Sequence, residues 1–283
     1  MMMIAPRRNV LVCFAAMLVL VALGSAAPAD ASRQVLAPAE HPLMPALRLA
    51  YDVRAHIVRE VKDYSCVLIK RERVDGQLLG HQYLFAKIRH EQVRAGRVVT
   101  PFSVYLHFLS PLRLRGREVL YVKGQNDGKL IARKGGPRFS YVTVSLDPLN
   151  ESAMKGNRYP ITEIGIQNLV ERLIEVGHEE MKQDPASQHC EVKFFDQAKV
   201  CGRECFSIRI GYPEEEREQR FHFVRIYVDK ELRVPIRYEA YDFPEVAGGA
   251  AKLLEEYTYR DLKLNIGLTD EDFQRSRFGS LVP

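Results

Sequence analysis

The 283-residue sequence lacks a second long apolar run, internal repeats and any low-complexity tract. Beyond Leu23, no apolar stretch approaches the roughly 20 residues that a membrane-spanning helix needs. No fixed period indicates a solenoid or propeller, and strands do not alternate with helices as they do around a parallel sheet. These absences argue against a multispanning membrane protein, a repeat protein and a doubly wound α/β fold.

Enzyme motifs are missing or incomplete. His178 begins a segment like the helical zinc motif, but Lys182 stands where the second histidine would be. The segment GQNDGK is one residue too short for a phosphate-binding loop. Ser152 and Lys155 match the S-x-x-K pattern of exported penicillin-interacting enzymes, yet no Lys-Thr-Gly follows to bind substrate. We therefore predict no enzyme, cofactor or metal site, and keep a serine hydrolase using Ser152 and Lys155 as a third interpretation.

The N-terminus has the three-part pattern of a secretory signal peptide. Arg7 and Arg8 precede an apolar run from Val10 to Leu23, and small residues follow up to Ala31. We expect residues 1–31 to be a signal peptide and residues 32–283 to be a single domain in the periplasm or another extracytoplasmic space. The alternative is an uncleaved N-terminal anchor.

Charge is unevenly distributed along the chain. Lys87 to Arg138 contains twelve basic and three acidic residues, whereas Glu214 to Asp272 contains nine basic and fifteen acidic ones. Such asymmetry can mark a surface that meets phosphate or anionic lipid, and it can equally be an ordinary solvated sheet face. Nucleic acid is not an expected partner, because the chain is exported.

Apolar periodicity predicts an α+β fold. Near-helical spacing favours helices from Pro42 to Tyr64 and from Pro160 to Asp184. A period of two predicts a hairpin over residues 63–90, with a turn at Asp75-Gly76. Further strands are expected at residues 102–108, 117–124, 129–134, 139–146, 191–200, 205–210, 221–229, 233–242 and 253–264. We predict an antiparallel sheet of roughly ten strands with two main helices.

Four cysteines follow the signal peptide: Cys66, Cys190, Cys201 and Cys205. An even number in an exported chain suggests disulfides. If Gly202-Arg203 is a two-residue turn, Cys201 and Cys205 point to opposite faces, whereas a three-residue loop would allow them to bond. Pairing either of them with Cys190 requires the outer strand to curl back. Free, half-buried thiols are the commonest outcome in such a sheet, and a metal site that adds His189 has an unusual spacing.

Several long segments resemble known families. The segments DYSCVLIKRE, GREVLYVKGQNDGKL, DKELRVPIRYEAYDFP and YTYRDLKLNIGLTDEDF are similar to an exported bacterial family of unknown function, DUF1571. The order of elements, and the closing hairpin with Pro235, resemble the outer-membrane lipoprotein carrier superfamily. That resemblance implies that the sheet of roughly ten strands is strongly curved (a half-open barrel) and that the two main helices cover its concave face. It also implies that the protein binds lipid or a lipid-modified protein.

The strand patterns predict one apolar face that could hold such a ligand. Its candidate residues fall on alternating positions: Val67, Ile69, Leu84, Ile88, Val104, Leu106, Phe108, Val224, Ile226, Ile236 and Tyr238. If the helices cover this face only in part, an apolar cleft remains. Candidate residues for an anionic head group or a partner are Lys87, Arg89, Arg113, Arg115 and Arg117.

Two functional hypotheses follow. The first is a non-enzymatic carrier or binding protein for lipid or a lipidated protein, which also meets the membrane surface. The second is an envelope protein-interaction or sensing module, in which the helices cover the same face completely and the interior is a filled core.

Overall fold

The computed structural model describes residues 40–135, 142–185, 190–212, 221–246 and 248–279. The predicted signal peptide lies outside these residues. So does the first part of the strand predicted at 139–146. Within the described residues, no helix is long and apolar enough to cross a membrane.

These residues form fourteen strands and three α-helices. The strands are β1 (Asp63–Val74), β2 (Gln77–Leu78), β3 (Gln82–Arg89), β4 (Gln92–Arg94), β5 (Arg97–Thr100), β6 (Ser103–Ser110), β7 (Glu118–Val122), β8 (Leu130–Arg133), β9 (Thr143–Leu146), β10 (Glu191–Val200), β11 (Arg203–Gly211), β12 (Phe223–Asp229), β13 (Pro235–Asp242) and β14 (Lys252–Leu264). The helices are α1 (Met44–Glu60), α2 (Glu151–Met154) and α3 (Ile166–Gln183).

The α+β class and the antiparallel sheet are confirmed, but the strand number and curvature are corrected. Twelve strands form one sheet in the order β10-β11-β12-β13-β14-β1-β3-β6-β7-β8-β9, with β2 on β1, and β4 pairs only with β5. The sheet is neither closed nor strongly curled. The prediction missed β2, β4 and β5 because they are short. The curvature is overestimated because it rests on the family resemblance, and the period of two in the strands does not specify how a sheet bends.

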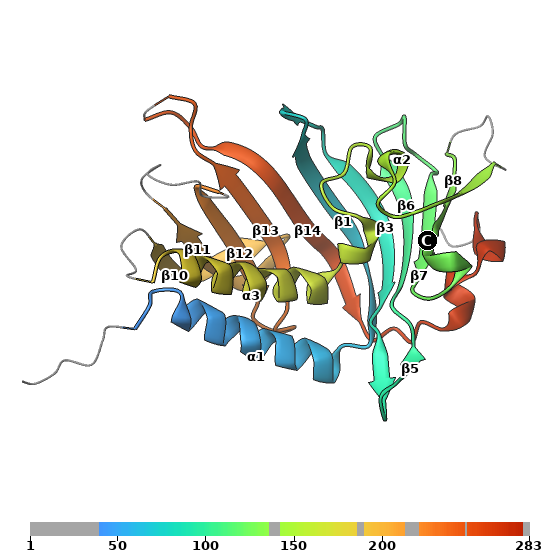
Figure 1. Ribbon diagram of the computed structural model, residues 1–283, viewed down its shortest axis with the longest axis horizontal. Coiled ribbons are helices and arrows are strands. Elements are labelled where there is room, and N and C mark those ends of the chain that lie inside the picture. Colours follow the sequence, from blue (N-terminus) through green and yellow to red (C-terminus); the bar gives the residue numbers. More distant parts are fainter. Residues whose placement is uncertain (1–39, 136–141, 186–189, 213–220, 247, 280–283) are drawn as a thin grey trace, which may run out of the picture. The chain divides into compact units, whose positions relative to one another are not determined.

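Two long helices cover one half of one face of the sheet. Figure 1 shows α1 and α3 lying side by side across the β10–β14 half. Helix α1 buries Leu47, Val53 and Ile57, and α3 buries Val170 and Ile174. Helix packing against this half therefore creates the main core.

Helix α3 begins several residues later than predicted. Gly165 has φ +116°, and a Cβ there would come within 3.0 Å of the Tyr64 hydroxyl oxygen. That hydroxyl accepts a 3.0 Å hydrogen bond from the backbone N–H of Ile166, which is one of the unpaired donors of the first helical turn. A tyrosine of β1 thus fixes the helix start, and residues 161–163 form a separate 3₁₀ turn, η2 (Ile161–Glu163).

The β12–β13 hairpin matches its sequence prediction. Asp229 Oδ1 accepts hydrogen bonds from the backbone N–H groups of Glu231 and Leu232, at 3.0 and 2.8 Å. Pro235 is the first residue of β13, where a missing ladder donor is tolerated. Ile226 pairs with Tyr238 across the two strands.

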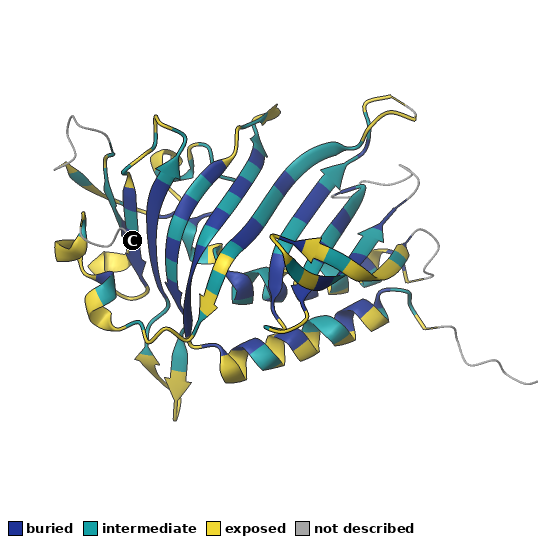
Figure 2. Cartoon of the chain, turned by 180° about the vertical axis from the view of Figure 1, so that it is seen from behind, coloured by how far each residue is buried: buried dark blue, intermediate teal, exposed yellow. Residues whose placement is uncertain are grey.

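The opposite face of the sheet has a smaller core of its own. Tyr105, Leu120 and Val122 pack there against Phe273, which lies in a 3₁₀ turn, η3 (Asp270–Phe273). Figure 2 shows buried and intermediate residues alternating along the central strands on this side. The apolar residues on both faces of β6 and β7 are therefore explained by two cores, one under the helices and one under the C-terminal segment, residues 265–279.

Candidate functional site

A large cavity lies on the helix side of the sheet. Its volume is about 1270 Å³. Strands β1, β3, β6 to β9 and β11 to β14 contribute lining residues from the sheet, with α3 and the segment from Pro148 to Gly165 opposite. Apolar lining residues of the sheet include Leu68, Leu84 and Phe108. The space between the sheet and these opposing segments is therefore hollow, whereas a second cavity beside α1 measures only about 60 Å³.

Nine of the eleven predicted apolar residues lie on the helix side, but they have different surroundings. Leu84, Leu106, Phe108, Val224 and Tyr238 line the large cavity. Ile226 lines the small cavity, and Ile88, Val104 and Ile236 are buried in the main core. Their role in binding stays a prediction, and only the first five lie where a ligand in the large cavity would touch them.

Val67 and Ile69 lie on the opposite face and correct the predicted set. Leu68, between them, lines the cavity and pairs with Leu84 and Tyr259. The error has a physical cause. The inward side chains of β1 change from apolar at Leu68 to charged at the positions after it, so an apolar pattern does not identify the inward face of this strand. A one-residue change of phase moves every side chain of a strand to the other face.

These inward charges form an inner polar cluster: Lys70, Glu72, Arg158 and Glu255, all of which line the cavity. Lys70 Nζ lies 2.9 Å from Glu72 Oε2, and Arg158 Nε lies 2.7 Å from Glu255 Oε2. Glu72 and Glu255 are direct cross-strand partners, although like charges in that position repel. The two cations offset this repulsion, so the cluster carries both signs of charge.

Uncharged groups complete the cluster. Tyr257 donates to Glu72 at 2.5 Å, and Tyr159 donates to Glu255 at 3.0 Å. Lys70 also donates to Asn157 at 2.6 Å. Because Asn157, Arg158 and Tyr159 belong to the segment opposite the sheet, these contacts attach that segment to β1 and β14.

Burial changes the acidity of the cluster. It raises the pKa of Glu255 above its ordinary value, since Arg158 only partly offsets the loss of water around the carboxylate. Burial, with help from Glu255, raises the pKa of Tyr159 to about 12. The pKa of Tyr257 is raised further for the same reasons. The tyrosine hydroxyls therefore remain neutral hydrogen-bond donors in the cavity at ordinary pH.

The predicted basic residues separate into two groups. Lys87 and Arg89 lie on the opposite face, where they pair with Asp272 and Asp270 of the C-terminal segment, both at distances below 3 Å. Neither lines the cavity. The acidic turn of η3 neutralises them there, which the strand pattern could not reveal because the contacts span more than 180 residues.

Arg117 is the member of this set that lines the cavity. Its guanidinium lies 5.7 Å from the ring centroid of Phe108. Arg113 and Arg115 are exposed in the loop just before it. Partial burial and the neighbouring charge of Arg113 lower the pKa of Arg117.

Ser152 and Lys155 show no catalytic arrangement. Ser152 is exposed in the single turn of α2 and borders the cavity, and Lys155 follows at the helix C-terminus. No hydrogen bond joins the two side chains within this described segment. The Ser152 backbone N–H instead binds the Asn150 side chain at 2.9 Å, as in an ordinary helix cap.

The four described cysteines are free thiols. Val200 pairs with Arg203, so Cys201 and Gly202 form the two-residue turn, one residue earlier than predicted. Cys201 is exposed and Cys205 is buried, and Cys205 pairs across the sheet with Ala198. The prediction of free thiols is confirmed for these residues.

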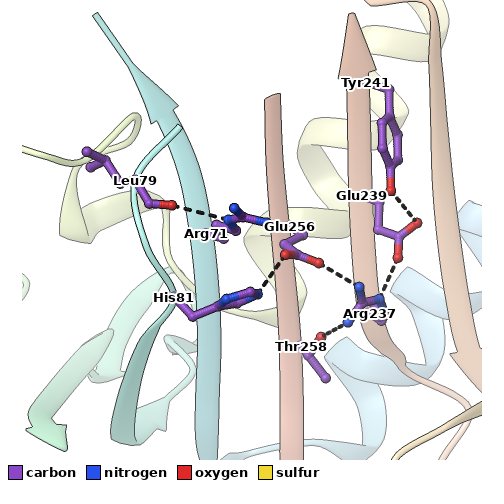
Figure 3. Close-up of polar contacts among 8 residues, drawn as sticks. All are labelled: Arg71, Leu79, His81, Arg237, Glu239, Tyr241, Glu256 and Thr258. Atoms are coloured by element: carbon purple, nitrogen blue, oxygen red, sulfur yellow. Dashed lines mark hydrogen bonds and ion pairs between the residues drawn. The ribbon is translucent and has the colours of Figure 1, made fainter. Parts of the chain in front are cut away.

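The face opposite the cavity is polar along β13, β14 and β1. In Figure 3, Arg237 donates to Glu239, Glu256 and Thr258, and His81 contacts Glu256 at 2.9 Å. Arg237 and Glu239 thus lie on the face opposite the cavity. Paired charges cover this part of that face beside Val67 and Ile69 of β1.

Comparison with known proteins identifies the family. A family model described as "Protein of unknown function (DUF1571)" matches residues 61–277. The chain belongs to DUF1571. The membership predicted from the sequence segments is thus confirmed. No curated protein gives a significant match to the chain.

Solved structures similar to this DUF1571 chain include three of low identity. A DUF1329 family protein from Desulfovibrio piger is 13% identical, covers 84% of this chain and 100% of its own, and has a TM-score of 0.40. A LolA superfamily protein from Nitrosomonas europaea is 11% identical, covers 81% of this chain and 98% of its own, and has a TM-score of 0.31. Lipoprotein LppX from Mycobacterium tuberculosis is 11% identical, covers 80% of this chain and 98% of its own, and has a TM-score of 0.41. These structures include a LolA superfamily protein, but similarity this low transfers neither ligand nor partner.

The sequence did contain a signal for the inner polar cluster. Lys70 and Glu72 follow Leu68 at intervals of two residues, so their side chains share its face of β1. Glu255 and Tyr257 are also two residues apart, so they share one face of β14. Charged residues in phase with buried apolar ones indicate a polar site inside a core. Arg158 and Tyr159 gave no such signal, because a loop has no period.

Proposed function

We propose that this protein is an extracytoplasmic, non-enzymatic carrier or binding protein for lipid or a lipid-modified protein, and that acyl chains occupy the large cavity. The observation that carries the proposal is the cavity itself. Its volume of about 1270 Å³ exceeds the roughly 300–1,000 Å³ of ordinary small-molecule sites. Each methylene buried there contributes about 0.8 kcal/mol.

The distribution of polar groups favours an amphiphile. Apolar side chains from β1, β3 and β6 line the cavity, and the inner polar cluster lies on β1, β14 and the segment from Pro148 to Gly165. The Tyr159 and Tyr257 hydroxyls and the cluster's charges can donate and accept hydrogen bonds. A chain with a polar end group matches this arrangement better than a purely apolar hydrocarbon.

The alternative is an envelope interaction module with a filled interior. Part of the core fits that description, since Ile88, Val104 and Ile236 are fully buried and do not line the large cavity. The space between the sheet and α3 does not, because it is hollow. The cavity is therefore the feature that separates the two hypotheses.

Filling the cavity tests the proposal. Val119→Trp and Ala132→Trp place bulk on two half-buried residues that line it. We expect wild-type protein purified from its native host to carry acyl species, detected by native mass spectrometry and lipid extraction. We expect each variant to bind a fluorescent fatty acid roughly tenfold more weakly, about 1.4 kcal/mol.

Val67→Trp is the matched control, because Val67 is also half-buried but lies on the opposite face. It should bind like the wild type. Wild-type protein that carries no acyl species and binds no fatty acid would contradict the proposal, as would equal losses in all three variants.

A further inference from the structure

The loop between β6 and β7 combines exposed apolar surface with positive charge. Residues 109–117 contain three arginines, at 113, 115 and 117, and no acidic residue. Leu112, in the middle, is 79% exposed, more than any other large apolar side chain in the described chain. We call residues 109–117 the basic loop.

The basic loop is held in a defined conformation. The backbone N–H groups of Leu114 and Arg115 both donate to the Pro111 carbonyl, and that of Gly116 donates to the Phe108 carbonyl. Leu114 packs against the main core. Because Leu114 points inward and the loop is fixed by these bonds, Leu112 is presented outward rather than buried by collapse of the loop.

The arginines of the loop have no acidic partner among the described residues. Arg115 donates to the Leu109 carbonyl, and Arg117 lies over the Phe108 ring, but none of the three forms an ion pair with a carboxylate of the described chain. The lowered pKa of Arg117 reflects the repulsion from Arg113 as well as partial burial. An external anion would relieve that repulsion.

The basic loop stands at the edge of the cavity. Arg117 lines it, as do Lys134, which directly follows β8, and the exposed Val142 and Val144. The ladder places these residues together, since β7 pairs with β8 and β8 with β9. Exposed valines beside cations therefore form one border of the cavity.

We propose that the basic loop docks this border of the cavity onto an anionic lipid bilayer, with Leu112 in the acyl boundary and Arg113, Arg115 and Arg117 on the lipid phosphates. Charge complementarity supports this partner, because the loop is cationic without internal neutralisation. Each arginine near an anionic surface strengthens binding several-fold, and an inserted leucine adds apolar burial. The inference extends the proposed function by giving the route through which a lipid would reach the cavity.

A second exposed hairpin has a similar composition and provides the control. The β4–β5 hairpin carries Arg94 and Arg97 together with the exposed Val93 and Val98. None of these residues lines the cavity. Docking through this hairpin would not bring the cavity to the membrane. Substitutions in the basic loop and in the hairpin therefore have different expected effects on membrane binding.

Vesicle co-sedimentation tests the proposal with the purified exported protein. The vesicles are phosphatidylcholine alone or phosphatidylcholine with phosphatidylglycerol at 7:3. We expect selective binding to the anionic vesicles, weakened by salt. Replacing Arg113, Arg115 and Arg117 by Gln should weaken that binding roughly 100-fold. Leu112→Ser should weaken it several-fold, and Arg94→Gln with Arg97→Gln should have little effect.

The outcome separates docking from ligand binding. The Leu112→Ser variant should still bind a fluorescent fatty acid like the wild type, because Leu112 does not line the cavity. Equal sedimentation of the wild type and the triple arginine variant with anionic vesicles would overturn the docking proposal and leave the carrier proposal intact. Loss of vesicle binding in the β4–β5 variant instead would overturn it too.

Discussion

Lys70 and Glu72 show how single residues depart from the simple pattern of an apolar interior. Their side chains are 10% and 5% exposed, and they pair on the cavity side of β1. Removing two charges from water is costly, and only close pairing with further hydrogen bonds repays that cost. Tyr257 and Asn157 supply those bonds.

Breaking this pair should destabilise the fold. In Lys70→Met, the Glu72 carboxylate keeps Tyr257 but loses its cation, and we expect a loss of about 3 kcal/mol in the free energy of unfolding, measured with urea. The double variant Lys70→Met with Glu72→Gln should recover more than half. Lys193→Met, which breaks an exposed pair with Glu191, should cost less than about 1 kcal/mol. Equal losses for the buried and exposed pairs would contradict this account.

Glu118 is a second fully buried charge, on the opposite face. Burial alone would raise its pKa, but the His107 ring, Tyr105, the backbone N–H of Gly279 and the charge of Arg133 together lower the pKa of Glu118 to about 2. Tyr105 and Gly279 donate to it at 2.5 and 2.9 Å. The carboxylate therefore holds β6, β8 and the C-terminal segment together.

The pH dependence of stability follows from that pKa. Because the folded pKa of about 2 lies below the ordinary value of 4.5, the contribution of Glu118 is complete above pH 4.5 and is lost as the pH falls toward 2. We expect the stability difference between the wild type and Glu118→Gln to shrink between pH 6 and pH 3, in urea titrations. A difference that stays constant over this range would count against the ionised carboxylate.

At the scale of elements, the C-terminal segment acts as a cover for the second core. Phe273 is 4% exposed against Tyr105, Leu120 and Val122, and the Arg89 guanidinium lies 5.0 Å from its ring centroid. The acidic turn of η3 thus combines apolar burial with two ion pairs to β3.

Removing the Phe273 ring should release this element. We expect Phe273→Ala to lower the free energy of unfolding by about 3–5 kcal/mol. Faster amide hydrogen exchange should be confined mainly to the C-terminal segment and to β6 and β7. Phe194→Ala, on the 49% exposed side chain of β10, should change stability by less than about 0.5 kcal/mol. Similar losses in both variants would show that the segment does not depend on this contact.

At the scale of the whole molecule, the cavity extends from the strands beneath α3 to strands that neither long helix covers. Over the remaining strands, the opposing wall is the segment from Pro148 to Gly165, which contains a single helical turn. A segment with so little regular structure presents few large side chains to the sheet. The space left between them is the hollow that we propose to be the ligand site.

The sequence by itself determined the elements and the family. Period-two and near-helical patterns placed the long strands and both long helices, because side-chain direction depends only on local geometry. Turn chemistry placed the turn at Asp75-Gly76, since its left-handed backbone conformation favours such residues. Long matching segments gave DUF1571.

Only the tertiary structure decided what depends on contacts between distant residues. It turned Leu68 rather than Val67 toward the cavity, directed Lys87 and Arg89 to the C-terminal segment, and brought Arg158 to Glu255. It also left a hollow between the sheet and α3 while it packed Ile88, Val104 and Ile236 completely. Local patterns specify which residues of a strand alternate between its two faces. Which face points inward, and whether the interior is filled, depend on all the elements that pack against the strand.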